Sequence, residues 1–133
     1  MDSDIAAYVQ RLHGTDHENA YFALIELDHS LVPDLIEAYR AEPSLRIKAL
    51  LIEIISEYRL PRSLDFLAES LQDANEEIWK TSLDGIVKIN DRSGLDILDK
   101  EKQRLIVGKS ADNTRVEWVE EAIRQLDENA AGG

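Results

Sequence analysis

The chain has 133 residues, a length that fits one domain able to bury most of its apolar surface without covalent cross-links. It contains no cysteine, which excludes disulfides, thiolate metal sites and a cysteine nucleophile. Its formal net charge of −12, from 27 acidic and 15 basic residues, disfavours binding to nucleic acid and to anionic bilayers.

The start of the chain and its short apolar runs predict a cytoplasmic protein without membrane contact. Residues 1–4 are acidic and lack the basic segment and apolar segment of a secretion signal. The longest apolar runs are only a few residues, far short of a membrane span. The negative charge has two interpretations, general solubility or steering toward a basic partner, and the layout of the charges must decide between them.

Three segments of the chain align when it is shifted by a fixed interval of 31 residues: 20–24, 51–55 and 82–86. A period of this length indicates stacked copies of one supersecondary unit. We therefore predict an all-α fold, an α-α superhelix (solenoid) of about four helical hairpins. The prediction is one domain over residues 1–129, with units at about 3–27, 28–58, 59–89 and 90–129, and a flexible tail over 130–133.

The first unit is short and polar at its start, as a terminal unit must be. In the second unit, Asp28 or Ser30 is a plausible cap for a helix that tolerates Pro33 in its first turn. Pro43 and Ser44 then break the chain and restart it as the second helix of the hairpin. The pattern predicts two antiparallel helices in each unit, eight in all.

The third unit repeats this pattern, with a turn at 73–75, and residues 91–94 connect it to the fourth. There the period lengthens: the step from Ser82 to Val119 is 37 residues, so we place a polar loop at 107–113, with Asn113 or Thr114 capping the last helix. Ser82 and Gly85 replace larger residues of the preceding unit, so the helices should approach closely there. The positions expected to be buried between layers are Leu51, Ile55, Ser82, Ile86 and Val119.

The segment from Leu71 to Trp79 resembles the junction of HEAT-like repeats of the short, phycobilin-lyase type. In that pattern a leucine, and an acid two residues later, precede a Val-Arg pair that opens the second helix. The preceding unit shows the same spacing in weaker form between Arg40 and Lys48. The column that carries arginine in the family reads His17, Lys48, Trp79 and Val116 here. The resemblance spans nearly the whole chain as a pattern of apolar positions.

HEAT-like proteins include several functional classes, so the resemblance implies a fold more than a function. They comprise protein-binding scaffolds, bilin lyase components, some DNA glycosylases, and small bacterial proteins that resemble toxin-neutralising immunity factors. Glycosylase activity would need a basic groove to hold phosphates, and the excess of acids argues against one.

The chain shows no motif typical of an enzyme, a metal site or a cofactor site. His13 and His17 have the spacing of a helical metal pair, but Gly14 and Thr15 should end the helix between them. Paired acids such as Glu76-Glu77 map to turns and exposed faces, without the shielded pocket that catalysis needs. We find neither a glycine-rich phosphate loop nor a nucleophile motif, and predict a non-enzymatic protein without metal or cofactor.

If the second helices line the concave side, one column along it reads Phe22, Glu53, Asp84 and Glu121. Three acids stacked one repeat apart repel each other unless they are solvated or meet a cation. Tryptophans beside these acids either anchor a partner or fill gaps between repeats. The candidate partner-binding residues are Glu53, Glu57, Trp79, Lys80, Asp84, Glu117, Trp118 and Glu121.

The resulting hypothesis is a protein–protein interaction module whose acidic concave face binds a basic protein. One specific form is a bacterial immunity protein that neutralises a cationic toxin. The alternative is an accessory subunit of an enzyme complex such as a bilin lyase, which would require an apolar cleft of chromophore size.

Overall fold

The computed structural model describes residues 3–108 and 113–132, and over these ranges the chain is helical with no strand. The elements are α1 (Ser3–Arg11), α2 (His17–Ile25), the 3-10 helix η1 (His29–Leu31), α3 (Val32–Ala41), α4 (Leu45–Glu57), the 3-10 helix η2 (Pro61–Ser63), α5 (Leu64–Ser70), α6 (Glu76–Ile89), α7 (Ser93–Val107) and α8 (Asn113–Gly132). The prediction of an all-α chain with eight α-helices is confirmed for the described residues.

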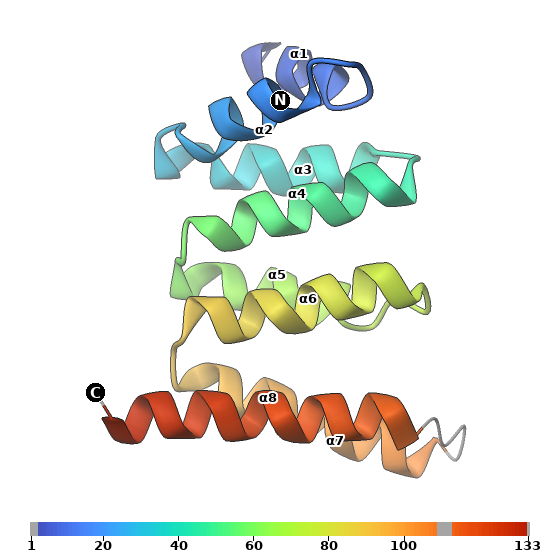
Figure 1. The fold of residues 1–133 in the computed structure, drawn as a ribbon, viewed down its shortest axis with the longest axis vertical. Helices are drawn as coiled ribbons and strands as arrows, with labels where there is room; N and C mark the ends of the chain where they lie inside the picture. Colours follow the sequence, from blue (N-terminus) through green and yellow to red (C-terminus); the bar gives the residue numbers. More distant parts are fainter. Residues whose placement is uncertain (1–2, 109–112, 133) are drawn as a thin grey trace.

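The helices pack as consecutive pairs, α1 with α2, α3 with α4, α5 with α6 and α7 with α8. The pairs follow one another along the long axis, and the two ends of the chain lie at opposite ends of it (Figure 1). The second helix of each pair contacts the second helix of the next, so α2, α4, α6 and α8 form one row. Helices α3, α5 and α7 lie behind this row in the view of Figure 1.

The signals that start the second helices recur at the predicted interval. Ser44 caps α4, accepting a hydrogen bond from the backbone N–H of Ile47 at 3.3 Å. Asn75 caps α6 in the same way, accepting from the N–H of Ile78 at 3.1 Å. Both cap and donor are shifted by 31 residues between the two helices, so the sequence period is a structural period here.

The ends of α4 and α6 also repeat. Arg59 has φ of 52° and Asn90 has φ of 57°, and the two residues are 31 positions apart. The left-handed conformation turns the chain out of the helix, and Asn adopts it more readily than Arg because its short side chain bonds locally. The same backbone bend therefore leads into the next pair after both helices.

The core lies between the rows and matches the predicted positions. Leu51, Ile55, Ser82, Ile86 and Val119 are all 0% exposed. The close approach predicted at Gly85 is also present, because a Cβ there would overlap the side chain of Ser56 on α4. α4 and α6 accordingly form the most extensive contact between described helices.

The structure differs from the sequence prediction at some boundaries. α8 continues to Gly132, so residues 130–132 of the expected tail are assigned to this helix. Residue 133 and most of the predicted 107–113 loop, residues 109–112, lie outside the described residues. Ala49 and Ser56 on α4 are also buried.

One further property concerns the length and apolar character of the helices. Within residues 3–108 and 113–132, none of the helices has the length together with the apolar composition of a membrane-spanning segment.

Candidate functional site

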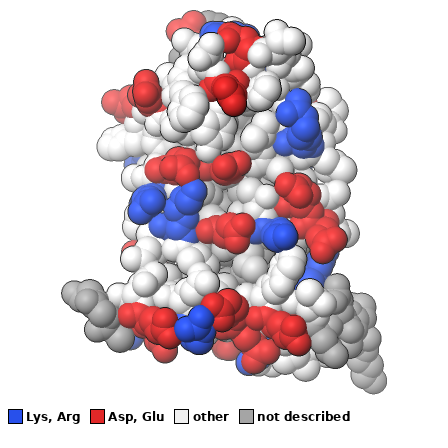
Figure 2. Space-filling view, viewed as in Figure 1, with Lys and Arg blue, Asp and Glu red and all other residues white. Residues whose placement is uncertain are grey.

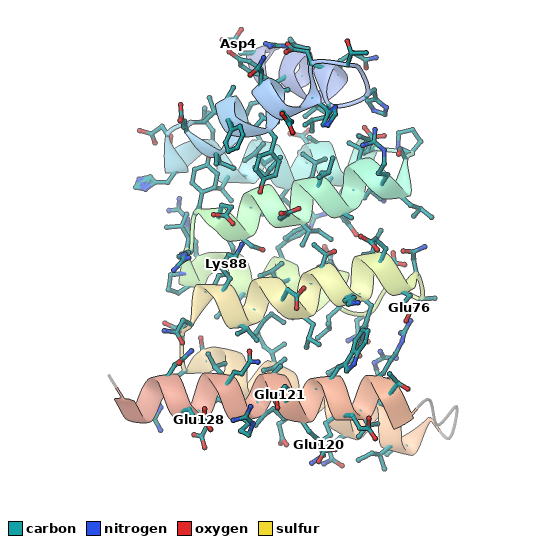
Figure 3. The ribbon with its side chains drawn as sticks, in the orientation of Figure 1. Asp4, Glu76, Lys88, Glu120, Glu121 and Glu128 are labelled. Atoms are coloured by element: carbon teal, nitrogen blue, oxygen red, sulfur yellow. The ribbon has the colours of Figure 1, made fainter. Side chains whose placement is uncertain are left out.

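The candidate residues are carried by three neighbouring helices of the front row. α4 carries Glu53 and Glu57, α6 carries Trp79, Lys80 and Asp84, and α8 carries Glu117, Trp118 and Glu121. We call the outward surface of α4, α6 and α8 the second-helix face. Figure 3 shows Lys88 in the space between α4 and α6, and Glu121 on the viewer's side of α8. The three helices thus bring side chains more than 60 residues apart in sequence onto one surface.

A pocket of about 230 Å³ lies between α6 and α8, and we call it the α6–α8 pocket. Its lining comprises Lys80, Leu83, Asp84, Val87, Trp118, Glu121, Ala122 and Gln125. Apolar side chains form part of the wall, while a lysine and two carboxylates supply charge. Four of the eight candidate residues therefore share one pocket.

A second hollow of about 230 Å³ lies between α4 and α6. It is lined by Glu53, Ser56, Thr81, Asp84, Gly85 and Lys88. Asp84 belongs to the lining of both hollows, so it joins them across α6. The column of Glu53, Asp84 and Glu121 consequently runs through two adjoining depressions rather than along a flat surface.

The second-helix face carries both signs of charge. Glu57 forms an ion pair with Lys88 one repeat later, and Glu121 forms one with Arg124 on its own helix. In the space-filling view, Lys and Arg side chains lie between the acids (Figure 2). Part of the repulsion expected along the column is therefore relieved within the protein.

The acids of the column differ in their surroundings. Burial raises the pKa of Asp84, and Lys80 and Lys88 act in the opposite direction. Hydrogen bonds from Arg124 and then Gln125 lower the pKa of Glu121. Asp84 is thus a partly desolvated carboxylate near two lysines, whereas Glu121 is a solvated one held by its own helix.

Glu53 has a partner from the first pair of helices. The Tyr21 hydroxyl donates a hydrogen bond to Glu53 at 3.2 Å, and burial, followed by Glu53, raises the pKa of Tyr21 to about 12. Phe22, at the start of the same column, is 56% exposed and packs edge-on against Tyr21. This aromatic pair on α2 therefore lies next to the Glu53 end of the second-helix face.

Trp79, one of the candidate residues, is not exposed on the second-helix face. It is 0% exposed and its indole N–H donates to Glu101 Oε2 at 2.7 Å. Its ring stacks on Trp118, with centroids 6.1 Å apart and planes at 25°. Trp79 is buried because α7 supplies Glu101 and α8 supplies Trp118, so the last pair of helices covers it. Its role is to fill the gap between repeats.

Glu101, which sequence reasoning missed, is a buried carboxylate at the centre of this contact. Its side chain is 1% exposed and accepts two hydrogen bonds from Arg104, each of 2.6 Å. Gln72 donates a further, longer bond of 3.3 Å. These donors, with Trp79, satisfy a charge that would otherwise be costly to bury. The only sequence signal was the three-residue spacing of Glu101 and Arg104, which is common on exposed helices.

Trp118 is half-buried and belongs to the lining of the α6–α8 pocket. The Lys80 ammonium lies 4.3 Å from the centroid of its ring, a cation–π geometry. Glu117 is exposed on α8 but does not belong to the lining of either hollow. Of the α8 candidates, Trp118 and Glu121 thus take part in the pocket and Glu117 lies outside it.

The histidines are not arranged as a helical metal pair. α1 ends at Arg11 and α2 begins at His17, so a turn separates His13 from His17 as predicted. His13 Nε2 lies 3.0 Å from Glu42 Oε1, whereas His17 Nδ1 lies 3.3 Å from the Gly14 carbonyl. Within the part of the chain that the structure describes, no group of three His, Asp or Glu side chains is placed to hold a metal ion.

Comparisons of the chain with family models, with curated proteins and with solved structures find no match. The resemblance to HEAT-like repeats accordingly stays a prediction from the sequence pattern.

Proposed function

We propose that the chain is a HEAT-like α-solenoid and a non-enzymatic interaction module whose second-helix face binds a basic protein. The observation that carries this proposal is the pair of adjoining hollows joined by Asp84, with an aromatic wall at Trp118 and carboxylates on three successive helices. Protein interfaces concentrate their binding energy in such places, where aromatic anchors sit in pockets surrounded by polar groups.

The proposed partner is positively charged because the chain itself is acidic. The chain carries a net −12, and Glu53, Asp84 and Glu121 each line a hollow of the face. A protein of opposite charge would be steered toward this surface at low ionic strength. Because Lys80 and Lys88 lie among the acids, the matching surface must place its charges in register, which favours a specific partner over any polycation.

One form of this function is a cytoplasmic bacterial immunity protein that neutralises a cationic toxin. Its support is the small size, the acidic charge and the resemblance to HEAT-like repeats. An accessory subunit of a bilin lyase is the second candidate, favoured by a hollow of about 560 Å³ between α5 and α7. Several apolar side chains line that hollow, but Asp65, Asp96, Lys100, Glu101 and Arg104 line it too. An apolar chromophore would have to desolvate these charges, so we place this candidate second.

The test is the kinetics of association with a basic partner recovered from the source cell and then purified. Substituting Gln for Glu53, Asp84 and Glu121 together should slow association and flatten its dependence on ionic strength, because charges at an interface act largely on encounter. Trp118→Ala should instead speed dissociation, at a cost of about 2 kcal/mol for a true anchor.

A matched control changes three exposed acids of the other row, Glu37, Asp65 and Asp99, to Gln. Both triple variants remove the same charge, so net charge alone predicts equal effects. If the two variants associate equally fast at low salt, or both match the unchanged protein, the second-helix face is not the binding surface.

A further inference from the structure

We propose that the α6–α8 pocket binds the guanidinium group of an arginine side chain. The inference rests on the proposed binding of a basic protein and names the group that one pocket recognises. It is drawn from the arrangement of three side chains, Asp84, Trp118 and Glu121, around a single hollow.

The pocket combines the two features that a planar cation uses. Trp118 offers an aromatic ring, over which cations are attracted by the ring quadrupole. Asp84 on α6 and Glu121 on α8 offer carboxylates from the two sides of the same hollow. A guanidinium has five N–H donors in a rigid plane, so it can stack on a ring and donate to carboxylates at its edges together.

Asp84 has the acceptor capacity that such a ligand needs. Among the described residues it forms no hydrogen bond, although Lys80 and Lys88 act on it electrostatically. Glu121, by contrast, is already held by Arg124 and Gln125. Asp84 is exposed, so a ligand can reach its carboxylate, and partial burial raises its pKa.

Lys80 shows where the cation would sit. Its ammonium lies 4.3 Å from the Trp118 ring centroid and belongs to the lining of the pocket. Lys80 is exposed, so its long flexible side chain can leave the ring for solvent. The protein thus covers Trp118 with a cation of its own, which an arginine from the partner displaces. A lysine from the partner would gain less, because its compact ammonium cannot stack on the ring and donate parallel hydrogen bonds to a carboxylate at the same time.

The experiment uses the full chain labelled with nitrogen-15 and three short peptides that differ at one residue: arginine, lysine or citrulline, the neutral isostere of arginine. The indole N–H signal of Trp118, assigned with Trp118→Phe, reports binding. We expect the arginine peptide to shift this signal with saturation and the lysine peptide to bind about tenfold more weakly, the ratio for one charge-assisted hydrogen bond. Citrulline and the Asp84→Asn variant should each abolish the shift.

Two further variants test whether the arginine peptide takes the place of Lys80 over Trp118 or responds only to the overall charge of the protein. Lys80→Gln and Lys88→Gln each remove one positive charge from α6, but only Lys80 lies over Trp118. We expect Lys80→Gln to tighten binding of the arginine peptide several-fold more than Lys88→Gln does, because it removes the cation that covers the Trp118 ring. Equal effects of the two changes would mean that only the summed charge matters, and would overturn the assignment.

The outcomes also separate this inference from the function on which it rests. If lysine and arginine peptides bind equally well, the pocket is not selective for guanidinium, while a slowed association of the triple Gln variant would still support the basic partner. If the arginine peptide binds as described but association with the partner ignores the second-helix face, the pocket assignment stands and the proposed function fails.

Discussion

Gly85→Ala is the most direct test of how closely α4 and α6 pack. Alanine in place of glycine inside a helix normally stabilises it by about 1 kcal/mol, because glycine loses more backbone entropy on folding. At this position the added methyl group has no free space. It would overlap Ser56 Oγ and lie 3.2 Å from Ser56 Cβ and 3.3 Å from Leu67 Cδ1.

The cost follows from what must move. Ser56 is 2% exposed, and its hydroxyl donates to the Ile52 carbonyl at 2.8 Å, so displacing it loses a buried hydrogen bond of about 1 kcal/mol. Overpacking a filled core costs about 1–3 kcal/mol in addition. After the propensity gain, Gly85→Ala should lower the free energy of unfolding by about 1–3 kcal/mol.

A double-mutant cycle with Ser56→Ala isolates the overlap. Removing the hydroxyl leaves only the tight contacts with Ser56 Cβ and Leu67, so Gly85→Ala should cost much less in that background, with a coupling of about 1–2 kcal/mol. The free energies are measured by urea unfolding followed by circular dichroism. The packing described for α4 and α6 would be refuted if Gly85→Ala were as stable as the unchanged protein, or if the two changes were additive.

Two more predictions concern Tyr21 and Glu101. The folded state raises the pKa of Tyr21 from 10.0 to about 12, so the contribution of this group to stability is complete below pH 10 and is lost as pH rises toward 12. Glu53→Gln should lower the pKa of Tyr21, measured by a phenolate absorbance titration. Arg104→Met should lower the free energy of unfolding by about 2 kcal/mol or more, because it leaves the buried Glu101 carboxylate poorly paired. The control Arg40→Met, which removes an exposed ion pair, should lower it by less than about 1 kcal/mol. Equal losses in urea unfolding would contradict the role given to Glu101.

The sequence alone determined the helical pairs and most of the core. Caps at Ser44 and Asn75, and apolar residues at helical spacing, act over a few neighbouring residues, so the pattern carries them directly. The 31-residue period added the register between Leu51 and Ser82, both of which are fully buried. The first and last units departed from the period, and there the sequence placed boundaries less well.

The charges of the candidate face needed the stacked helices. The column of Glu53, Asp84 and Glu121 follows from the period, but the pairing of Glu57 with Lys88 joins residues one repeat apart. Flexible charged side chains choose partners by distance in space, and spacing along the chain does not show which of several nearby acids a lysine will meet. The two hollows that Asp84 joins likewise exist only between packed helices.

Trp79 shows most clearly what the sequence alone could not predict. Its position beside the predicted concave face was compatible with an exposed anchor or with a gap filler, since both use a large aromatic ring. Only the packing of α7 and α8 decides, because Glu101 comes from one and Trp118 from the other, both across the lengthened fourth unit. Burial of a side chain is a property of everything that surrounds it, and here two of those surroundings lie more than 20 residues away in the chain.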